Sequence, residues 1–551
     1  MRTEPPTAPR PAPARTVREA LRQVDASARA LRDAGQLDES WALLLAALEA
    51  ALVQTRDLRL LVAKLQRERL GLRSERVAQA QLALLFEALV ELGPLTEAEV
   101  ARETEADAAL EREIAEATQT ARPARTRSGR RVRTRGVRQQ GHAVPVPAAE
   151  QVCGICARPM AKIGVDVTRR LEYVPGHFIE HAYQRDKYAC GTCKEGVTTA
   201  PAPPAVLPRS AAEPSVLAHL VVSKYLDHVP LHRLHRVYAR SGAAIPVSTL
   251  ADWTAGVADR LAPLVDRLAA RVRAATVVRT DATGLKVLDP SRAAHIERGT
   301  IWAYVGDDRD VLFRYTPTAE GATGPWAFLA GRTGYVQADA SATFDRLFTG
   351  HVARAIEVGC WAHGRRPLVD LADTDCRVAY PLQLIRRLYR LEHLADVQQL
   401  GPEARQALRQ ARTAPVLERL QRWVAVTCAS EPPSTALAKA AAYLQRHWIA
   451  LSRFLDDGRL SCDNTLTERQ IRDIALGRRN YLFAGSHEAA SRAATLYSLT
   501  RTCAQYRVPP VPYFTDVLQH LATGAVGTLD DLLPHRWHVR HPGTAHPADS
   551  S

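Results

Sequence analysis

Four cysteines lie in two pairs whose spacing suits a metal ion: Cys153-Gly-Ile-Cys156 and Cys190-Gly-Thr-Cys193. Two intervening residues allow both sulfurs of a pair to reach one tetrahedral Zn²⁺, and four thiolates leave no open position for a substrate. The pairs therefore predict a structural zinc site. The 33 residues between them exceed the usual spacing of about 15–20, so a disulfide or free thiols remain the alternative.

Three acids far apart in the sequence could form a second metal site. Asp281 and Asp339 each follow a short β-branched or apolar run, and Glu468 lies in a helical segment. In that segment Asn464, Glu468 and Arg472 recur every four residues and so share one helical face. Clusters of carboxylates hold two Mg²⁺ or Mn²⁺ ions about 4 Å apart for phosphodiester transfer. The three acids are our candidate catalytic residues and magnesium ligands.

Each acid also has a structural interpretation when it is taken alone. Asp281 could end a strand in a turn, and Asp339 could cap a helix at 341–348. Glu468 could close a capping box with Thr465. The order of all three, downstream of the cysteine pairs, favours the catalytic interpretation.

The segment from about 274 to 360 has the pattern of a mixed sheet. We expect strands at 276–280, 300–305, 311–315, 334–338 and 355–358, and short helices at 325–330 and 341–348. Hairpins followed by alternating strands and helices are the order of an RNase H-like core, in which the first and fourth strands are adjacent. Asp281 and Asp339 would then meet at one end of the sheet.

Two further segments point to nucleic acid. A basic helix predicted at 230–242 ends in glycine, and Ser248 would cap a second helix at 249–260, which is a helix-turn-helix outline shared by ordinary helical hairpins. Residues 122–138 contain eight Arg, including Arg130, Arg131 and Arg133, and no acid. Such a block has little to bury and can lie along phosphates or act as a solvated spacer.

Composition narrows the class of protein. The 551 residues carry a net charge of +14 and have a pI of about 9.5, which suits a polyanionic partner. The basic side chains comprise 66 Arg and only 7 Lys, a bias typical of GC-rich genomes, so only local Arg clusters count as evidence. No apolar run approaches the ~18 residues of a membrane span, and no secretion signal is recognisable. We expect a soluble cytoplasmic protein with no membrane association.

The chain is predicted to be a multidomain α+β protein. An apolar residue every seven positions over 44–72 indicates a coiled-coil seam or, alternatively, an amphipathic helix in a bundle. The expected parts are a disordered tail (1–16), a helical leucine-zipper segment (17–118), an Arg-rich linker (119–149), a zinc ribbon (150–200), helix-turn-helix-like helices (209–270), an RNase H-like catalytic domain (271–500) with a helical insertion at about 367–455, and a C-terminal helical segment (501–540).

Longer motifs resemble those of transposases of the insertion sequence 66 family, over about residues 40 to 536. The motifs are Leu70-Gly-Leu-Arg-Ser-Glu75, Tyr173-Val-Pro, Arg185-Asp-Lys-Tyr-Ala-Cys190, Ser223-Lys-Tyr-Leu-Asp-His-Val-Pro-Leu-His-Arg233, Gly359-Cys-Trp-Ala-His-Gly-Arg-Arg366, Leu476-Gly-Arg-Arg-Asn-Tyr-Leu-Phe-Ala-Gly-Ser486 and Thr528-Leu-Asp-Asp-Leu-Leu-Pro534. The resemblance implies a DDE-type transposase with Asp281, Asp339 and Glu468 at the family's acidic positions.

The chain departs from the family's usual motifs beside each acid. It reads Asp281-Ala-Thr for Asp-Glu-Thr, Asp339-Ala-Ser for Asp-Gly-Tyr, and Cys462-Asp-Asn464 for Asp-Asn-Asn. None of these changes removes a predicted ligand.

Some further residues are candidates for auxiliary roles. Cys360 and His363 form a C-x-x-H motif like one in related transposases, which could position the insertion or a flipped base; a packed Cys and a hydrogen-bonded His are the alternative. Candidate phosphate contacts are Arg365, Arg366, Arg472, Arg478 and Arg479, with a solvated helical face as the alternative.

We therefore expect a transposase that binds terminal inverted repeats, nicks to expose a 3′-OH and joins that end to target DNA. Its partners would be double-stranded DNA, further copies of the chain, and accessory proteins that the resemblance suggests. Two rival hypotheses are a decayed zinc-containing DNA-binding protein and an RNase H-like structure-specific nuclease.

Overall fold

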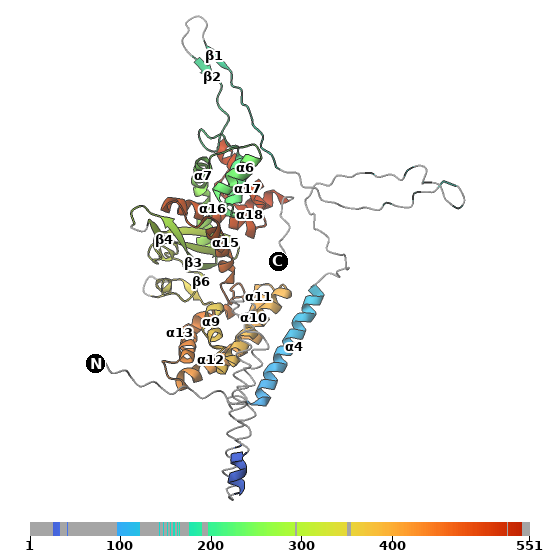
Figure 1. Cartoon of the computed structure of the whole chain (residues 1–551), viewed down its shortest axis with the longest axis vertical. Helices are drawn as coiled ribbons and strands as arrows, with labels where there is room; N and C mark the ends of the chain where they lie inside the picture. Colours follow the sequence, from blue (N-terminus) through green and yellow to red (C-terminus); the bar gives the residue numbers. More distant parts are fainter. Residues whose placement is uncertain are drawn as a thin grey trace. The chain divides into compact units, whose positions relative to one another are not determined.

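The structure is a computed structural model that describes most of the chain beyond residue 197. The described residues are 26–33, 41, 44, 96–121, 143, 147, 151, 155, 158, 159, 162, 165, 176–189, 197–292, 295–349, 354–525 and 527–542. They belong to two compact units, one of Met1–Ala121 with Trp361–Gly458 and one of Arg122–Cys360 with Arg459–Ser551. Figure 1 labels their elements. Most of the predicted coiled coil lies outside the described residues.

A five-stranded mixed sheet is the centre of the second unit. Its strands are β3 (Val277–Leu288), β4 (Ile296–Gly306), β5 (Asp310–Thr316), β6 (Tyr335–Gln337) and β7 (Ile356–Val358), in the order β5-β4-β3-β6-β7. The first three form antiparallel hairpins, whereas β6 pairs in parallel with both β3 and β7. The first and fourth strands of the sheet are therefore adjacent, as the sequence pattern predicted.

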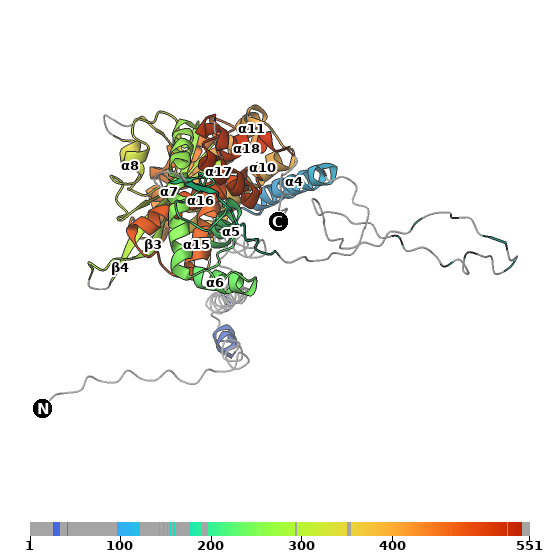
Figure 2. The same ribbon diagram turned by 90° about the horizontal axis from the view of Figure 1, so that it is seen from above.

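Helices of the same unit pack on this sheet (Figure 2). Those that share its hydrophobic core are α5 (Pro214–Tyr225), α7 (Val247–Ala274), α15 (Thr465–Tyr481), α16 (His487–Gln505), α17 (Pro510–Thr523) and α18 (Pro534–Arg540). The helix α6 (Leu231–Arg240) packs instead in a smaller cluster with α5 and α7. Hydroxyls on α16 close the outer edge of β5, because Ser498 and Thr502 accept hydrogen bonds from the N–H groups of Phe313 and Val311, at 2.8 and 3.1 Å. These bonds satisfy backbone donors that an edge strand otherwise exposes.

Several local expectations were wrong in detail. The helix expected at 341–348 is reduced to a single 3₁₀ turn, Asp345–Leu347. The second helix of the helix-turn-helix outline begins at Val247 with Pro246 before it and continues to Ala274, so Ser248 lies inside the helix and is not its cap. Its extra length packs against the sheet, a tertiary contact that capping residues cannot predict.

The first unit is helical. It contains α4 (Glu97–Ala121), α9 (Trp361–Leu371), α10 (Ala379–Val397), α11 (Pro402–Leu408), a π-helical turn η4 (Arg409–Thr413), α12 (Ala414–Ser430), α13 (Ala436–Arg446) and α14 (Trp448–Ser452). Arg409 is fully buried there and donates to both carboxylate oxygens of Glu392 at 2.7 Å. Among the helices that the structure describes, none is both long and apolar enough to cross a membrane.

Arg332 acts as a buried brace for the sheet. Its guanidinium donates to the carbonyl oxygens of Arg273, Ala275, Thr276 and Tyr335 at 2.7–3.3 Å. These carbonyls belong to the end of α7, the turn before β3, and β6. One side chain therefore fixes where β3 and β6 begin. Burial lowers the pKa of this guanidinium from its ordinary value.

We expect Arg332→Met to lower the free energy of unfolding by about 2–4 kcal/mol, because several buried carbonyls lose their donor while the side-chain volume is largely kept. Chemical denaturation would measure the change. Arg233→Met on the exposed side of α6 is the control and should stay within about 0.5 kcal/mol of the unmodified protein. Equal stability of both variants would contradict the bracing role.

Candidate active site

The parallel pairing of β3 and β6 sets the register of two of the candidate acids. The last paired residues are Arg279 and Gln337. Asp281 follows two residues later within β3, and Asp339 follows two residues after the end of β6, which lies beside β3 at the usual strand spacing of about 4.8 Å. Because side chains alternate between faces with period two, Asp281 lies on the same face of β3 as Arg279, which is also the face of the paired Gln337. Both acids are half-buried.

Hydrogen bonds join the turn before α15 to the face of the sheet on which Arg279 and Gln337 lie. Gln337 is completely buried and its Nε2 donates to the carbonyl oxygens of Gly359 and Ser461, at 3.0 and 2.9 Å. Arg279 Nη1 donates to Asp463 O at 3.4 Å. Arg279 and Gln337, each two residues before a candidate acid, thus hold the start of α15 against β3 and β6.

Asn464 fixes the helix itself. It is 1% exposed, and its Nδ2 donates to Thr280 O, the residue before the first acid, at 2.9 Å. Its backbone N–H donates to Cys360 Sγ at 3.3 Å, and its Oδ1 accepts from Thr467 Oγ1 at 2.7 Å. Glu468 is exposed in the first turn of α15, four residues after Asn464. The third candidate acid is therefore carried by a helix whose N-cap residue is anchored beside Asp281.

The structural alternatives for the acids do not fit this geometry. Asp281 lies inside β3 and does not end it. Asp339 precedes no α-helix, because only a 3₁₀ turn follows. Thr465 is the first helical residue of α15 and Asn464 is its cap, so Thr465 and Glu468 cannot form the predicted capping box.

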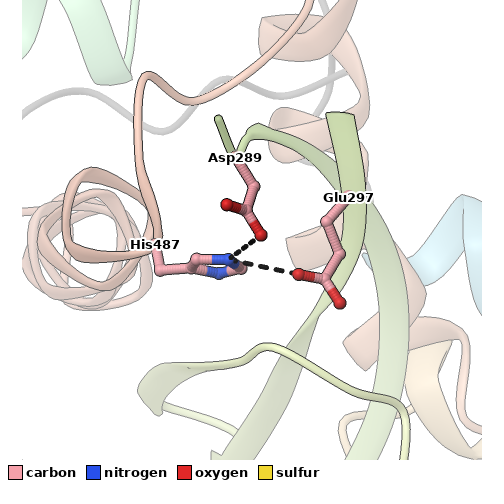
Figure 3. A group of neighbouring side chains, drawn as sticks. All are labelled: Asp289, Glu297 and His487. Atoms are coloured by element: carbon pink, nitrogen blue, oxygen red, sulfur yellow. Dashed lines mark ion pairs between the residues drawn. The ribbon is translucent and has the colours of Figure 1, made fainter. Parts of the chain in front are cut away.

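The second unit contains two groups of possible metal ligands, and they differ in how close their ligand atoms lie. Among the described residues, only Asp289, Glu297 and His487 form a group of three potential metal ligands whose atoms all lie within 4.8 Å of one another (Figure 3). The carboxylates of the three candidate acids are not that close together. Two ions about 4 Å apart divide their ligands between them, so a two-metal site does not require one compact sphere. Carboxylate oxygens are the donors that Mg²⁺ prefers.

The Asp289–Glu297–His487 group is better explained as an ion-pair cluster. Arg292 lies 2.8 Å from Glu297 and 3.7 Å from Asp289, and so supplies positive charge to both carboxylates. His487 Nε2 is 3.3 Å from Glu297, while its Nδ1 is 2.7 Å from the Tyr315 hydroxyl. The cluster ties the β3–β4 hairpin to the first residue of α16.

The predicted phosphate ligands on α15 have different surroundings. Arg472 and Arg479 are exposed. Arg478 is half-buried and donates to Gly284 O of β3; burial and then the nearby Arg298 lower its pKa. Arg478 therefore supports the strand that carries Asp281.

The C-x-x-H motif spans the boundary between the two units. Cys360 is buried and its thiol accepts the Asn464 N–H described above. His363, Arg365 and Arg366 lie on α9 of the other unit. Within the described residues, His363 Nδ1 is buried without a hydrogen-bond partner, and the Arg365 guanidinium lies 5.3 Å from the centre of the Tyr389 ring. Arg366 is exposed.

Sequence reasoning missed Arg279 and Gln337, although a signal was present. Each is a buried polar residue that directly follows two mainly apolar strand residues, two positions before a candidate acid. Arg279 also pairs with Asp308 at 2.8 Å. Burial raises the pKa of Asp308, and the Arg279 charge opposes that rise.

The other predicted site residues lie outside the described residues. They are the four cysteines Cys153, Cys156, Cys190 and Cys193, and the arginines Arg130, Arg131 and Arg133.

Comparison with known proteins identifies the family. Residues 209–492 match the family described as "Transposase IS66 family", and residues 150–194 match the "zinc-finger binding domain of transposase IS66". The chain belongs to the IS66 family of transposases. The matched core contains the three acids and the anchoring residues, and the zinc-finger match contains both cysteine pairs of this IS66-family transposase.

Similar proteins occur in Sinorhizobium fredii (strain NBRC 101917 / NGR234). The IS66-family chain is 30% identical to the uncharacterized protein y4jD over 421 residues, which cover 73% of this chain and 81% of y4jD. It is 29% identical to the uncharacterized protein y4hP over 504 residues, covering 87% of this chain and 88% of y4hP. The likeness therefore extends well beyond residues 209–492, which the family model matches.

Asn464→Asp tests the anchoring of α15. The change keeps the side-chain size but replaces the Nδ2 donor with an oxygen facing Thr280 O. We expect a fall in strand-transfer rate of about 10–100-fold, of the order seen when outer-shell partners of metal ligands are changed, with a higher Mg²⁺ concentration needed for half-maximal activity.

Asn480→Asp is the matched control, since Asn480 lies on the same helix and donates to Leu476 O at 3.3 Å. It should keep both the rate and the metal requirement. A rate loss for Asn464→Asp without a change in metal requirement would indicate a purely structural role.

Proposed function

We propose that the chain is a DDE-type DNA transposase that binds the terminal inverted repeats of its element, nicks each end to expose a 3′-OH, and joins that end to target DNA. The observation that supports this most is the register of β3 and β6, which pairs Arg279 with Gln337, the residues two positions before Asp281 and Asp339. The bond from Asn464 to Thr280 supports the assignment of Glu468 as the third acid.

The sheet order supports an RNase H-like core. An antiparallel three-stranded portion, β5-β4-β3, continues into two parallel strands, β6 and β7. Residues 361–458 then form helices before the chain returns at α15. This order supports an RNase H-like fold, with residues 361–458 as a helical insertion between the second and third candidate acids.

The three carboxylates fit two Mg²⁺ or Mn²⁺ ions, which when bound would activate the attacking oxygen and stabilise the leaving oxygen. The protein's own contribution is positioning. Buried Gln337 and Arg279 hold the two strands and the turn before α15 in one arrangement, so the carboxylates need not be reorganised when DNA arrives. Exposed Arg472, four residues after Glu468, would contact DNA phosphate on the same face of α15.

The partners follow from this reaction. Double-stranded DNA of the element ends and the target would be bound, and pairing of two ends favours a homo-oligomer, with accessory proteins of the same element as further partners. The site of action would be the nucleoid in the cytoplasm. Retention of all three acids argues against a decayed DNA-binding protein, and a nuclease of the same fold would cut without joining.

Asp281→Asn, Asp339→Asn and Glu468→Gln should each abolish strand transfer while binding to inverted-repeat DNA stays nearly intact. Each change removes one hard oxygen ligand without deleting volume. A joining assay with pre-nicked element ends, run beside an end-binding titration, measures both properties.

Asp345→Asn, at an exposed acid of the neighbouring 3₁₀ turn, is the control and should join normally. Full joining by any of the three variants would remove that acid from the site. Cutting without joining by the unmodified protein would favour the nuclease.

The zinc-finger domain should bind about one Zn²⁺ per chain through its four cysteines. Cys153→Ser should lower the zinc content and loosen this domain, while the five-stranded sheet and the helices packed on it stay folded. Cys428→Ser changes a half-buried free cysteine of α12 and should leave the zinc content unchanged. Elemental analysis of freshly purified, reduced protein measures the zinc content. Protein without zinc would contradict the assignment of the four cysteines as zinc ligands.

A further inference from the structure

The helix α4 has an unusually acidic composition. It carries eight acidic and two basic side chains, in a chain whose net charge is +14. Within the first unit it packs against α10, and Figure 1 shows it lying along the helices of residues 361–458. Those residues contain fourteen basic and ten acidic side chains. A helix of net charge −6 therefore covers a body of net charge +4.

The carboxylates of α4 meet arginines at its contact with that body. Glu103 accepts from Arg387 Nη1 at 2.7 Å and also pairs with Arg419. Asp107 accepts from Arg387 Nε at 2.5 Å. The Arg387 side chain is only 7% exposed under this contact. The pairing is therefore largely shielded from water.

The same pattern continues along the helix. Glu111 pairs with Arg390, whose side chain is 13% exposed, and Glu113 pairs with Arg412 at 2.8 Å. The four arginines come from α10, η4 and α12, and all of them face one side of α4. Residues 103, 107 and 111 follow at intervals of four, which spaces their carboxylates by about 6 Å along the helix axis.

The apolar part of this contact is small. Leu110 is buried against Leu391 and Leu394, with Ile114 and Ala117 partly buried beside it. Charge therefore supplies much of the attachment of α4. The pair of Arg412 and Glu113, whose side chains are each 40% exposed, is weakened by salt and by competing anions, whereas the buried pairs of Arg387 are screened much less. The guanidinium groups that donate to carboxylates here bind phosphates with the same forked geometry.

We propose that the four arginines Arg387, Arg390, Arg412 and Arg419 form a binding surface for the DNA backbone, and that α4 occupies this surface as a carboxylate strap until duplex DNA displaces it. The proposal rests on the proposed function, because it assumes that DNA is the polyanion. The row of carboxylates takes the place of consecutive phosphates, so α4 and DNA compete for the same side chains. The surface recognises no sequence, because phosphate contacts position DNA without specifying it.

The test uses the full chain with Glu103→Gln and Asp107→Asn combined. These changes keep the side-chain shapes but remove two carboxylates that hold Arg387 and Arg419. We expect affinity for random duplex DNA to rise at least ~10-fold, and the slope of log K against log salt to steepen by about 2–4, at ~0.9 per phosphate contact. Adding Arg387→Gln and Arg390→Gln to this variant should restore most of the original slope.

The matched control is Glu105→Gln with Glu116→Gln. Both residues lie on α4 and are exposed, so the control changes the charge of the chain by the same amount without touching the contact. It should leave the slope within about 0.5 of the unmodified protein. Equal steepening in both variants would overturn the proposal, because net charge alone would then explain the effect.

A second measurement covers the case in which the α4 variant fails to fold. Hydrogen exchange of the unmodified protein, with and without saturating random duplex DNA, should show faster exchange in α4 when DNA is bound. Unchanged or slower exchange in α4 with DNA bound would overturn the strap. Absence of any DNA binding would instead contradict the proposed function, so the two failures are distinguishable.

Discussion

The parallel pairing of β3 with β6 is the constraint on which the candidate site depends. It is only three residue pairs long, yet it sets the register in which Asp281 and Asp339 each follow two residues after the last pair, Arg279 and Gln337. A slip by one residue would turn one acid to the opposite face. The pairing is reinforced at one end by Arg332, which bonds carbonyls before β3 and in β6, and at the other by Gln337 and Arg279, which bond the turn before α15. All three of these polar side chains are buried.

The sequence predicted the strands and their neighbours better than it predicted the contacts that hold them. Short β-branched runs marked β3, β6 and the order of the sheet. The length of β3 was missed, because residues 282–288 are stabilised by pairing with β4 and carry no continuous apolar run. The helix expected after Asp339 does not form beyond a single 3₁₀ turn. Local propensity alone could not reveal either outcome.

Arginine explains another limit of sequence reasoning. The chain contains 66 Arg, but some of them are buried inside the protein and do not contribute to its surface charge. Arg332 and Arg409 are buried and donate to carbonyl oxygens, and Arg409 also meets Glu392. A guanidinium can satisfy several acceptors at once because its five N–H donors lie in one plane. Net charge therefore overstates how many arginines face a polyanion, and the role of each must be argued from its contacts.

The position of the helical insertion follows from the same few bonds. The chain leaves the second unit, which contains the sheet, after Cys360 and returns to it at Arg459. Gln337 donates to Gly359 O before the exit and to Ser461 O after the return, and Cys360 accepts the N–H of Asn464. Both ends of the insertion are thus fixed beside the strand that leads to Asp339. Because closing a loop costs little more when the loop is longer, a large helical body can be inserted here without separating the two ends. The position of α15 against β3 therefore depends on Gln337 and Asn464, whose buried hydrogen bonds must stay formed. Glu468 keeps its position only as long as α15 does.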